Sequence, residues 1–353
     1  MTNYQKIINS LLFLIFNILF FPLINFYRIL NENGGSEWLT AEWLINYDYG
    51  FVRRGGFGFL LDLVTNNFNS KLTLLILILS FLYFYIVNSV LILYVSQKQN
   101  FISLILLFSP LFLFFPLYDI QGSFRKELLG FAIFLYLLKN FKIKSNNYLI
   151  LFFYTVAIFS SEVNLLFYPF IVYFIFKNFE KNIFLKYFFI FSSINSIYIF
   201  FYLFFSNTFS EKFAKICNSL ITSGLKNNIC DGALYSSSLN LYETIQKYGY
   251  INLNFDSIFT HFVILIIALL PLIKSSLFKK NLNIFILIFV YFLLFFIISA
   301  DWGRWLHIFI FCITCLYFIE PGKQNLKLNY LYKILIFIFY SQTWNVNHFK
   351  NNL

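Results

Sequence analysis

Charged residues are scarce in this sequence. Lysine, arginine, aspartate and glutamate together make up 12% of its 353 residues, and 60% of the chain is hydrophobic. Soluble domains are usually about 25% charged and about 45–50% apolar, so this composition excludes a soluble globular protein. The polar connections are too short to fold as soluble domains. The sequence therefore predicts an all-α, polytopic helical membrane protein, with residues 1–353 in a single integral membrane domain.

Cysteine is also rare, and the four cysteines fall into two pairs. Cys312 and Cys315 lie in an apolar run without a metal-site or redox context, which predicts buried thiols. Cys217 and Cys230 lie in a long polar loop, where we expect a disulfide if that loop faces an oxidising compartment. The alternative is two unpaired thiols. No cluster of ligands in the sequence demands a metal, so no cofactor is assigned and a divalent metal stays an open alternative.

Acidic residues are fewer than basic ones, which gives a net charge of +11. A strongly basic chain can indicate nucleic-acid binding. Here the lysines are dispersed in short connections between apolar runs, where they set the membrane topology instead. We therefore expect membrane lipid, and no nucleic acid, among the partners of the protein.

Apolar runs of about 17–25 residues are long enough to cross a bilayer as helices. The runs that we expect to span lie at residues 7–26, 72–94, 101–117, 128–138 with its polar flanks, 183–205, 258–273, 284–299 and 305–319. A weaker run covers residues 331–340. With the broken segment described below, they give about 10–11 spans.

Lysine in alternate connections predicts the orientation. With Lys6 inside, the inner connections contain 14 lysines and two acids, Glu180 and Glu320, as the positive-inside rule requires. The other acids and all five arginines then lie outside. We expect a cytoplasmic N-terminus, a first outer loop at residues 28–71 and a large outer loop at residues 206–257.

The apolar run at residues 148–176 has lysine-rich flanks at both ends, which places both ends inside. It is too short for two full spans. We predict a hairpin of two short helices, each about 20 Å long, with its apex at Ser160, Ser161 and Glu162. Such breaks are tolerated where they line a polar cavity. The alternative, a single tilted span, would place the later lysine-rich loops outside.

The first outer loop begins with large apolar side chains at helical spacing, which predicts an interfacial helix lying on the outer surface. These side chains belong to Trp38, Leu39, Trp43, Leu44 and Tyr47. In such a helix Glu37 and Glu42 face away from the apolar stripe.

A polar stretch follows, in which Asp48 precedes the pair Arg53 and Arg54. A carboxylate can act as a general base toward a sugar hydroxyl, and a guanidinium suits phosphate or pyrophosphate. Glycines that allow close approach to a ligand follow directly, at Gly55, Gly56 and Gly58. The alternative is an ion pair between Asp48 and Arg53, with the glycines in a turn.

Other outer segments also contain charged or titratable residues beside apolar runs: Asp119, Arg125, Lys126 and Glu127, then Glu162, then Asp301, Arg304 and His307. Two adjacent cations at a helix start oppose the helix dipole, which indicates an anionic ligand. A carboxylate inside an apolar run is costly and indicates function. The alternative for Glu162 is a structural pair with Arg125 or Arg304. Asp301 can instead cap its helix, and His307 can be a core residue.

Four short motifs mark these outer segments: Tyr-Asp-Tyr-Gly-Phe-Val-Arg-Arg-Gly at 47–55, Phe-Arg-Lys-Glu at 124–127, Ser-Glu at 161–162 and Asp-Trp-Gly-Arg-Trp at 301–305. This layout resembles polytopic membrane proteins of bacterial surface-polysaccharide loci. It is similar to the GT-C type of glycosyltransferase and to O-antigen or exopolysaccharide polymerases. The resemblance covers most of the chain in layout and rests on short motifs. The chain lacks the large C-terminal soluble domain frequent in GT-C enzymes, which keeps the polymerase open.

The resemblance implies a catalytic acid in the first outer loop, at Asp48, with Glu37 and Glu42 as further candidates. It implies transfer of a sugar from a polyprenyl phosphate or pyrophosphate carrier to a glycan or lipid acceptor, at the outer face of the bacterial inner membrane. Asp48 or Glu162 would deprotonate the acceptor. The phosphate would be bound by Arg53, Arg54, Arg125, Lys126 and Arg304. Supporting residues would be Asp119, Glu127, Asp301 and His307.

The competing class is a transporter or a flippase for lipid-linked glycans. In it, Glu162 and Asp301 would bind a proton or cation, and broken helices are equally natural. A transporter should show polar residues through both halves of the bilayer, whereas here they concentrate outside, which favours an enzyme. A scaffold for polysaccharide export would leave Glu162 without a purpose.

Overall fold

A computed structural model describes residues 15–32, 35–65, 67–96, 101–140, 148–249, 255–273, 275–299, 301–320 and 330–342. Every regular element in these ranges is a helix, and they contain no strand. The helices long and apolar enough to cross a membrane are Phe68–Val95, Lys181–Phe205, Ser276–Ile298 and Trp302–Ile319. Shorter apolar helices are Ile15–Leu30, Tyr148–Ser160 and Ile258–Ile273. The chain is therefore a helical membrane protein.

The helices follow one another in chain order as α2 (Phe20–Glu32), α3 (Leu39–Leu44), α4 (Gly56–Val64), α5 (Phe68–Ser96), α6 (Phe101–Leu107), α7 (Phe115–Tyr118), α8 (Ile120–Ser123), α9 (Glu127–Lys139), α10 (Tyr148–Ser160), η1 (Glu162–Phe167), α11 (Tyr168–Asn178), α12 (Lys181–Phe205), η2 (Ser206–Thr208), α13 (Phe209–Thr222), η3 (Asn227–Cys230), α14 (Ala233–Ser238), α15 (Leu241–Tyr248), α16 (Phe255–Ile273), α17 (Ser276–Ile298), α18 (Trp302–Ile319) and α19 (Tyr330–Gln342). The predicted first run at residues 7–26 begins outside the described residues.

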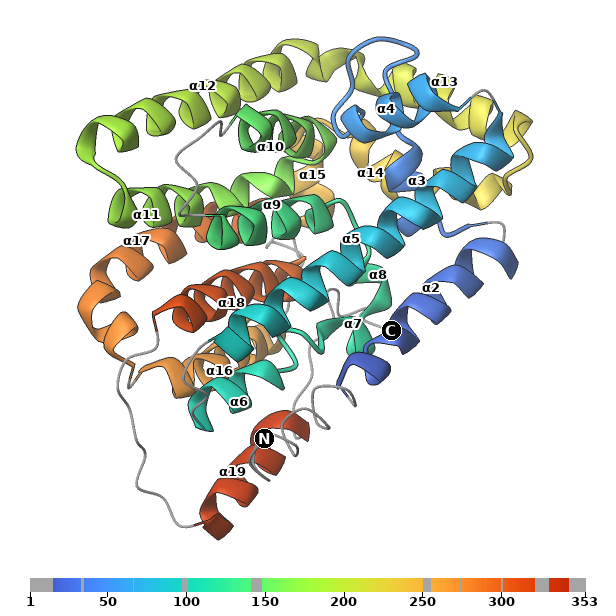
Figure 1. The fold of residues 1–353 in the computed structure, drawn as a ribbon. Coiled ribbons are helices and arrows are strands. Elements are labelled where there is room, and N and C mark those ends of the chain that lie inside the picture. Colours follow the sequence, from blue (N-terminus) through green and yellow to red (C-terminus); the bar gives the residue numbers. More distant parts are fainter. Residues whose placement is uncertain are drawn as a thin grey trace.

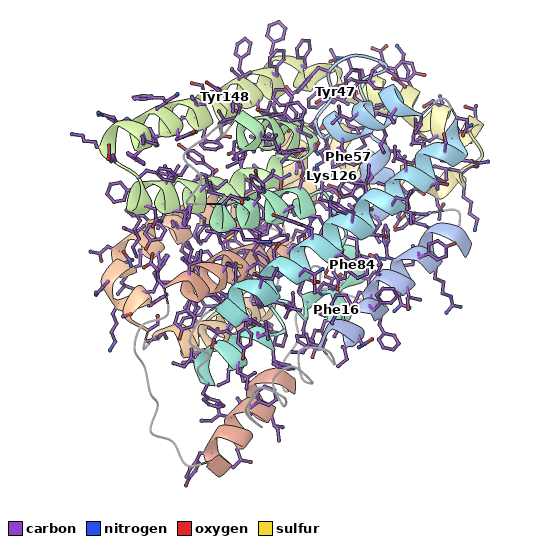
Figure 2. The ribbon with its side chains drawn as sticks, viewed as in Figure 1. Phe16, Tyr47, Phe57, Phe84, Lys126 and Tyr148 are labelled. Atoms are coloured by element: carbon purple, nitrogen blue, oxygen red, sulfur yellow. A yellow bond between two sulfur atoms is a disulfide. The ribbon has the colours of Figure 1, made fainter. Side chains whose placement is uncertain are left out.

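Helix α18 forms the centre of the molecule. It contacts α5, α9, α16, α17 and η1, which surround it in Figure 1. All its residues from Gly303 to Phe318 are buried, including the thiols of Cys312 and Cys315. Aromatic side chains fill the space between the helices, as the rings of Phe16 and Phe84 do at 5.8 Å (Figure 2). Apolar helices can face either lipid or other helices in a membrane protein, and α18 is packed among other helices, whereas most of α12 and α17 is not buried.

The prediction of one continuous span at residues 101–117 is wrong. Helix α6 ends at Leu107, and turns lead to the short helices α7 and α8. Pro110 explains the break, because proline lacks an N–H and disfavours the helical conformation in the residue before it. The residues from Ser109 to Phe115 are buried in protein, which is where irregular backbone is tolerated in a membrane protein.

The apolar run at residues 148–176 is broken at the predicted apex. Helix α10 ends at Ser160, Ser161 is extended, and the chain reverses through η1 into α11 (Figure 1). The Asn164 side chain donates to the carbonyl oxygen of Ala157 at 2.9 Å and so satisfies a backbone group near the break. Glu162 begins the return segment, at the edge of the pocket described below.

The prediction of an interfacial helix in the first outer loop is wrong. All six residues of α3 are buried, and the Trp43 indole donates to the carbonyl oxygen of Phe124 at 2.8 Å. Helix α14 covers α3, and Leu44 joins a second hydrophobic cluster with α13 and α14. The large side chains that suited an interface therefore pack inside the protein, under a segment far along the chain.

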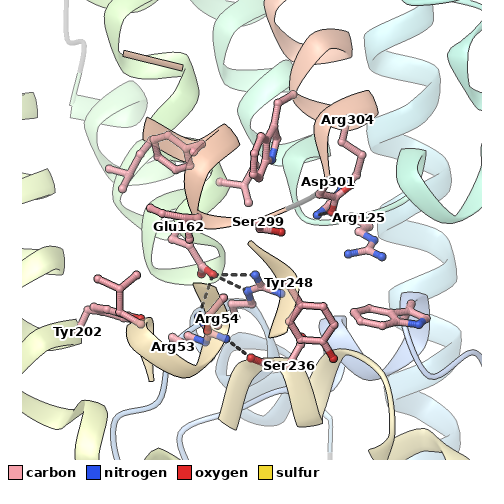
Figure 3. A pocket seen from close by; sticks show the side chains of 18 of the residues that line it. Arg53, Arg54, Arg125, Glu162, Tyr202, Ser236, Tyr248, Ser299, Asp301 and Arg304 are labelled. Atoms are coloured by element: carbon pink, nitrogen blue, oxygen red, sulfur yellow. Dashed lines mark hydrogen bonds and ion pairs between the residues drawn. The ribbon is translucent and has the colours of Figure 1, made fainter. Parts of the chain in front are cut away.

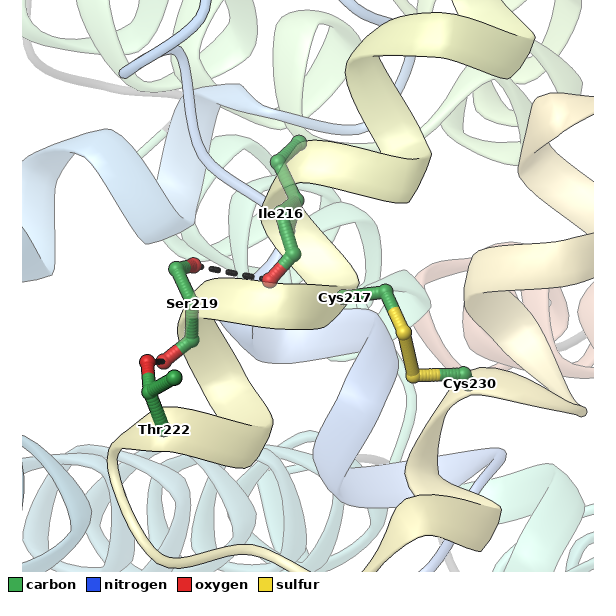
Figure 4. Close-up of a disulfide and its surroundings, with 5 residues drawn as sticks. All are labelled: Ile216, Cys217, Ser219, Thr222 and Cys230. Atoms are coloured by element: carbon green, nitrogen blue, oxygen red, sulfur yellow. Dashed lines mark hydrogen bonds between the residues drawn. A yellow bond between two sulfur atoms is a disulfide. The ribbon is translucent and has the colours of Figure 1, made fainter.

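That covering segment, which we call the lid, comprises helices α13, η3, α14 and α15. A disulfide between Cys217 and Cys230 joins α13 to η3, with a Cα–Cα distance of 5.6 Å (Figure 4). The lid also contacts α17 through α15. The large predicted loop at residues 206–257 is thus mostly helical, and it is packed against the first outer loop.

Candidate functional site

A pocket of about 630 Å³ lies between the lid and the central helices. Its charged lining residues come from four of the predicted polar segments: Glu37, Arg53, Arg54, Arg125, Glu162, Asp301 and Arg304. The lid contributes Ser236, Thr244 and Tyr248. An apolar wall comes from α12, with Ile199 and Leu203, and from α17, with Phe295 and Ile298. The fold therefore gathers polar segments that are far apart in the sequence around one cavity.

One side of the pocket is built on Glu162. Its Oε1 accepts from Nε of Arg54 at 2.9 Å and from NH2 of Arg54 at 2.7 Å, and NH1 of Arg53 lies 3.7 Å away (Figure 3). The Tyr198 hydroxyl approaches Oε2 at 3.5 Å. Glu162 therefore forms a structural ion pair, as the alternative in the sequence analysis expected. The expected partners were wrong, because Glu162 pairs with Arg54 and Arg53 and not with Arg125 or Arg304.

Arg54 has a left-handed backbone conformation, with φ of 65°, which is costly for a side chain with a Cβ. The ammonium group of Lys126, which is fully buried, donates to the Arg54 carbonyl oxygen. This bond holds the strained residue in place. Lys126 does not line the pocket, so its position is that of a support for Arg54 and not of a phosphate ligand.

Arg53 ties the first outer loop to the lid. Its Nε donates to the carbonyl oxygen of Ser237 at 2.9 Å, and its NH2 donates to that of Ser236. The ion pair between Asp48 and Arg53 that the sequence allowed does not form, because the guanidinium points into the protein toward the lid and Glu162.

The second side of the pocket holds Arg304. Its NH1 donates to Oε1 of Glu127 at 2.8 Å, and its NH2 donates to Oδ2 of Asp301. Arg304 and both carboxylates are buried. The triad joins the start of α9 to the start of α18, and it fixes the geometry of this part of the pocket.

Arg125 lies on the same side of the pocket as Asp301 and Arg304, with Ser299 between this side and Glu162 (Figure 3). Its Nε donates to the Gln121 carbonyl oxygen at 3.0 Å, and the guanidinium carbon lies 5.3 Å from the centre of the Trp38 ring. Cation–π contact of this kind orients the guanidinium plane.

Glu42 is a buried carboxylate behind the pocket that sequence reasoning did not assign a pairing role. Its Oε1 lies 3.7 Å from NH1 of Arg54, and its Oε2 lies 3.7 Å from NH1 of Arg125. Neither oxygen accepts a hydrogen bond in the described structure. The Glu42 carboxylate therefore attracts one arginine on each side of the pocket, Arg54 and Arg125. Large apolar side chains flank it closely on both sides in the sequence, which was the signal that could have predicted its burial.

Glu37 reaches the pocket from the first outer loop, and its side chain is partly exposed. Its carbonyl oxygen accepts from the backbone N–H of Ala233 in the lid at 2.9 Å. A Cβ at Gly232 would lie 2.6 Å from that oxygen, so only glycine allows the approach. Among the described residues, no ion pair engages the Glu37 carboxylate.

Besides Lys126 and Glu127, three further sequence candidates lie outside the pocket. Asp48 is exposed, and its carboxylate accepts from Asn46 Nδ2 at 2.7 Å. Asp119 caps α8 by accepting from the Gly122 N–H at 2.7 Å. The His307 ring stacks on Phe115 with centroids 4.2 Å apart, in the core. The structure brings none of the three to the pocket, because loop geometry and helix rotation direct them elsewhere.

The glycines after Arg54 do not make room for a ligand. A Cβ at Gly56 would lie 2.9 Å from the backbone of Phe159, and one at Gly58 would overlap the Ile45 carbonyl oxygen. These positions let α4 pack closely on α10 and α3. The predicted close approach is therefore real, but the partner is the protein itself.

Electrostatics distinguish two of the buried groups. Burial alone would raise the pKa of Glu162, which lies at the break between α10 and α11, but the charges of Arg54 and Arg53 outweigh it and lower the pKa to about 2. Burial lowers the pKa of Lys126 to about 7, since nearby carboxylates offset only part of the desolvation. Glu162 is thus a permanent anion at neutral pH, and a poor general base.

No group of three or more histidine, cysteine, aspartate or glutamate side chains is arranged to hold a metal ion in the part of the chain that the structure describes. The pocket instead offers carboxylates, guanidinium groups and hydroxyls beside an apolar wall. This set of groups suits general acid–base chemistry on an amphiphilic anion.

Comparisons of the chain with protein family models, curated proteins and solved structures return no match. The likeness to GT-C enzymes and polymerases therefore rests on the motifs and on the layout of the polar segments.

Proposed function

We propose that the protein is a membrane glycosyltransferase that uses a polyprenyl-linked sugar as its donor, in the synthesis of a cell-surface polysaccharide. The observation that carries this proposal is the pocket of about 630 Å³, in which a charged side adjoins an apolar wall. A lipid-linked sugar has the same division, because a polar sugar and its phosphate follow a long hydrocarbon chain.

The apolar wall supports a lipid carrier. Ile199 and Leu203 of α12 line the pocket, and their side chains are 45% and 59% exposed. Phe295 and Ile298 of α17 line it as well. In a bilayer, these exposed faces contact lipid, so the hydrocarbon chain of the donor reaches the pocket laterally between α12 and α17 without crossing water.

Glu37 is the residue that we assign as general base, in place of Asp48 and Glu162. It lines the pocket and has no ion-pair partner in the described structure, whereas Glu162 is held by two arginines. Glu37 takes the proton of the acceptor hydroxyl, and the acceptor oxygen bonds to the anomeric carbon of the donor sugar. The bond from that carbon to the phosphate oxygen breaks, and its electron pair stays on the phosphate.

The same proposal places the protein in the bacterial inner membrane with a cytoplasmic N-terminus, about 10–11 crossings in a GT-C-like arrangement, and the pocket on the outer side. Lysine in the inner connections supports this orientation. A single cysteine introduced at exposed Lys215 of the lid, in a chain without its four native cysteines, should react with an impermeant maleimide in intact spheroplasts. Reaction only after lysis would invert the orientation.

The test of function uses the full-length protein. Cells of the native host that carry Glu37→Gln should lose or truncate a surface glycan, and the purified wild-type protein in nanodiscs should release sugar from a polyprenyl-linked donor. Glu211→Gln serves as the matched control, because Glu211 lies exposed on α13 outside the pocket. Normal glycans in the Glu37→Gln strain, with the variant inserted at wild-type level, would contradict the proposal. Movement of an intact lipid-linked glycan across vesicles, without sugar release, would identify a flippase instead.

A further inference from the structure

The four arginines that line the pocket differ in how their donor groups are used. Arg53 gives two hydrogen bonds to lid carbonyl oxygens, Arg54 gives two to Glu162, and Arg304 gives one each to Glu127 and Asp301. A guanidinium has five donors, and in each of these three side chains at least one terminal nitrogen is bound to the protein, so none of them offers both terminal nitrogens to a ligand. These three side chains therefore build the walls of the pocket.

Arg125 is different. Its only hydrogen bond in the described structure is from Nε to Gln121, so both terminal nitrogens have unused donors. Glu42 lies 3.7 Å from NH1, which is too far for a hydrogen bond but close enough to balance part of the charge. The side chain is 2% exposed and lines the pocket beside the Trp38 ring. It is thus a pre-oriented, buried fork of donors with an open end.

Charge counting limits what this fork can bind. The pocket and its immediate supports contain five cations, Arg53, Arg54, Arg125, Lys126 and Arg304, and five carboxylates, Glu37, Glu42, Glu127, Glu162 and Asp301. Because burial lowers the pKa of Lys126 to about 7, the cluster carries no excess of positive charge near neutral pH before any substrate enters. A ligand with several negative charges would be repelled by buried carboxylates, whereas one phosphodiester carries a single charge and matches one guanidinium.

We propose that Arg125 is the single phosphate subsite of the pocket, and that the donor is joined to its lipid through one phosphate and not through a pyrophosphate. This inference rests on the proposed function. When the sugar leaves, the phosphodiester becomes a phosphate monoester and gains negative charge, which the two terminal nitrogens of Arg125 stabilise. The Gln121 side chain, which also lines the pocket, lies in the same part of the wall.

Binding to the purified full-length protein in nanodiscs tests this assignment. The probes are a polyprenyl phosphate, the matching polyprenyl pyrophosphate, phosphatidic acid and inorganic phosphate. We expect the polyprenyl phosphate to bind at least as tightly as the pyrophosphate, and to bind at least about 10-fold more weakly to Arg125→Ala. Arg125→Lys keeps the charge but loses the fork, so it should recover only part of the affinity. Lys215→Ala removes an exposed lid cation and should change nothing.

The outcomes separate the two proposals. Tighter binding of the pyrophosphate, or unchanged binding to both Arg125 variants, would overturn the single-phosphate subsite and leave the glycosyltransferase standing. Polyprenyl carriers that bind no better than phosphatidic acid would remove the proposed function itself. Competition by millimolar inorganic phosphate alone would point to free phosphate as the occupant and overturn the inference. If Arg125→Ala does not fold, Arg125→Lys and the wild-type ranking of the carriers decide.

Discussion

The two sides of the pocket hold similar residues in different states. Around Glu162, Arg54 and Arg53 each donate two hydrogen bonds to the protein, from Nε and from one terminal nitrogen. Around Arg125, two terminal nitrogens are unused and the nearby Glu37 has no ion-pair partner among the described residues. A charged side chain in a pocket is therefore not by that fact alone a catalytic or ligand-binding residue. Groups with unused donors or acceptors are the ones that can act on a substrate.

The largest effect that this comparison predicts is on catalysis by Glu37→Gln. Loss of a general base should lower the transfer rate by about 10²- to 10⁴-fold. Because the carboxylate makes no ion pair in the described structure, the midpoint of thermal unfolding should stay unchanged. Sugar release in nanodiscs and a melting curve of the same preparation measure the two. A variant with a lower unfolding midpoint and an unchanged transfer rate would show that Glu37 has a structural role and not a catalytic one.

Glu162→Gln should have the opposite signature. It leaves two buried arginine charges without their anion, which costs about 3 kcal/mol or more of the free energy of unfolding. Glu320→Gln is the matched control, since its pair with Lys177 is about one-third exposed and should contribute at most about 1 kcal/mol. Equal losses from the two substitutions in detergent unfolding curves would show that the Glu162 pair is not locked.

The acid dependence of stability gives a second measure of Glu162. Its folded pKa of about 2 lies below the ordinary value of 4.5, so the stabilisation is fully present above pH 4.5 and is lost as the pH falls toward 2. We expect the unfolding midpoint of the wild type to fall across that range by more than the midpoint of Glu162→Gln. Parallel curves for the two proteins would contradict the assigned charge.

The disulfide holds the lid that both sides use. Changing Cys217 and Cys230 to serine should lower stability by about 2–4 kcal/mol, because the unfolded chain loses a constraint. The lid contacts Arg53 through Ser236 and Glu37 through Ala233. Transfer should therefore also fall in the double variant and in reduced wild type. Reduced protein with full activity and stability would show that the lid holds its place unaided.

The smallest expected effect is that of Gly232→Ala. The added Cβ would meet the Glu37 carbonyl oxygen, and relief of such a clash costs about 1–3 kcal/mol. We expect a lower rate with little change at the Glu162 side, whose pairs do not touch Gly232. Ser223→Ala, at an exposed position of the lid whose side chain bonds only locally to Ser219, serves as the control. Equal transfer rates for the two variants would show that the contact between the lid and Glu37 does not affect catalysis.

Sequence reasoning found much of the fold and part of the site. Long apolar runs predicted the helices α5, α12, α17 and α18, and the costly carboxylate Glu162 marked a real break in an apolar run. Arg53, Arg54, Arg125 and Arg304 all line the pocket. Asp48 does not, since one exposed turn carries it outward. The sequence did not reveal Glu42 as a buried ion-pair partner, because the arginines near it, Arg54 and Arg125, lie 12 and 83 residues further along the chain.

The membrane class of the protein and the positions of its charged segments along the chain follow from local properties. Hydrophobic run length and the paucity of charge decide membrane insertion, and these are local properties of the chain. Which charged side chains form hydrogen bonds or ion pairs with other protein groups depends on the tertiary structure. Whether Arg125 or Arg54 keeps both terminal nitrogens unbound depends on acceptors brought from distant segments. Hydrogen bonds act over about 3 Å, so no spacing along the chain can reveal them.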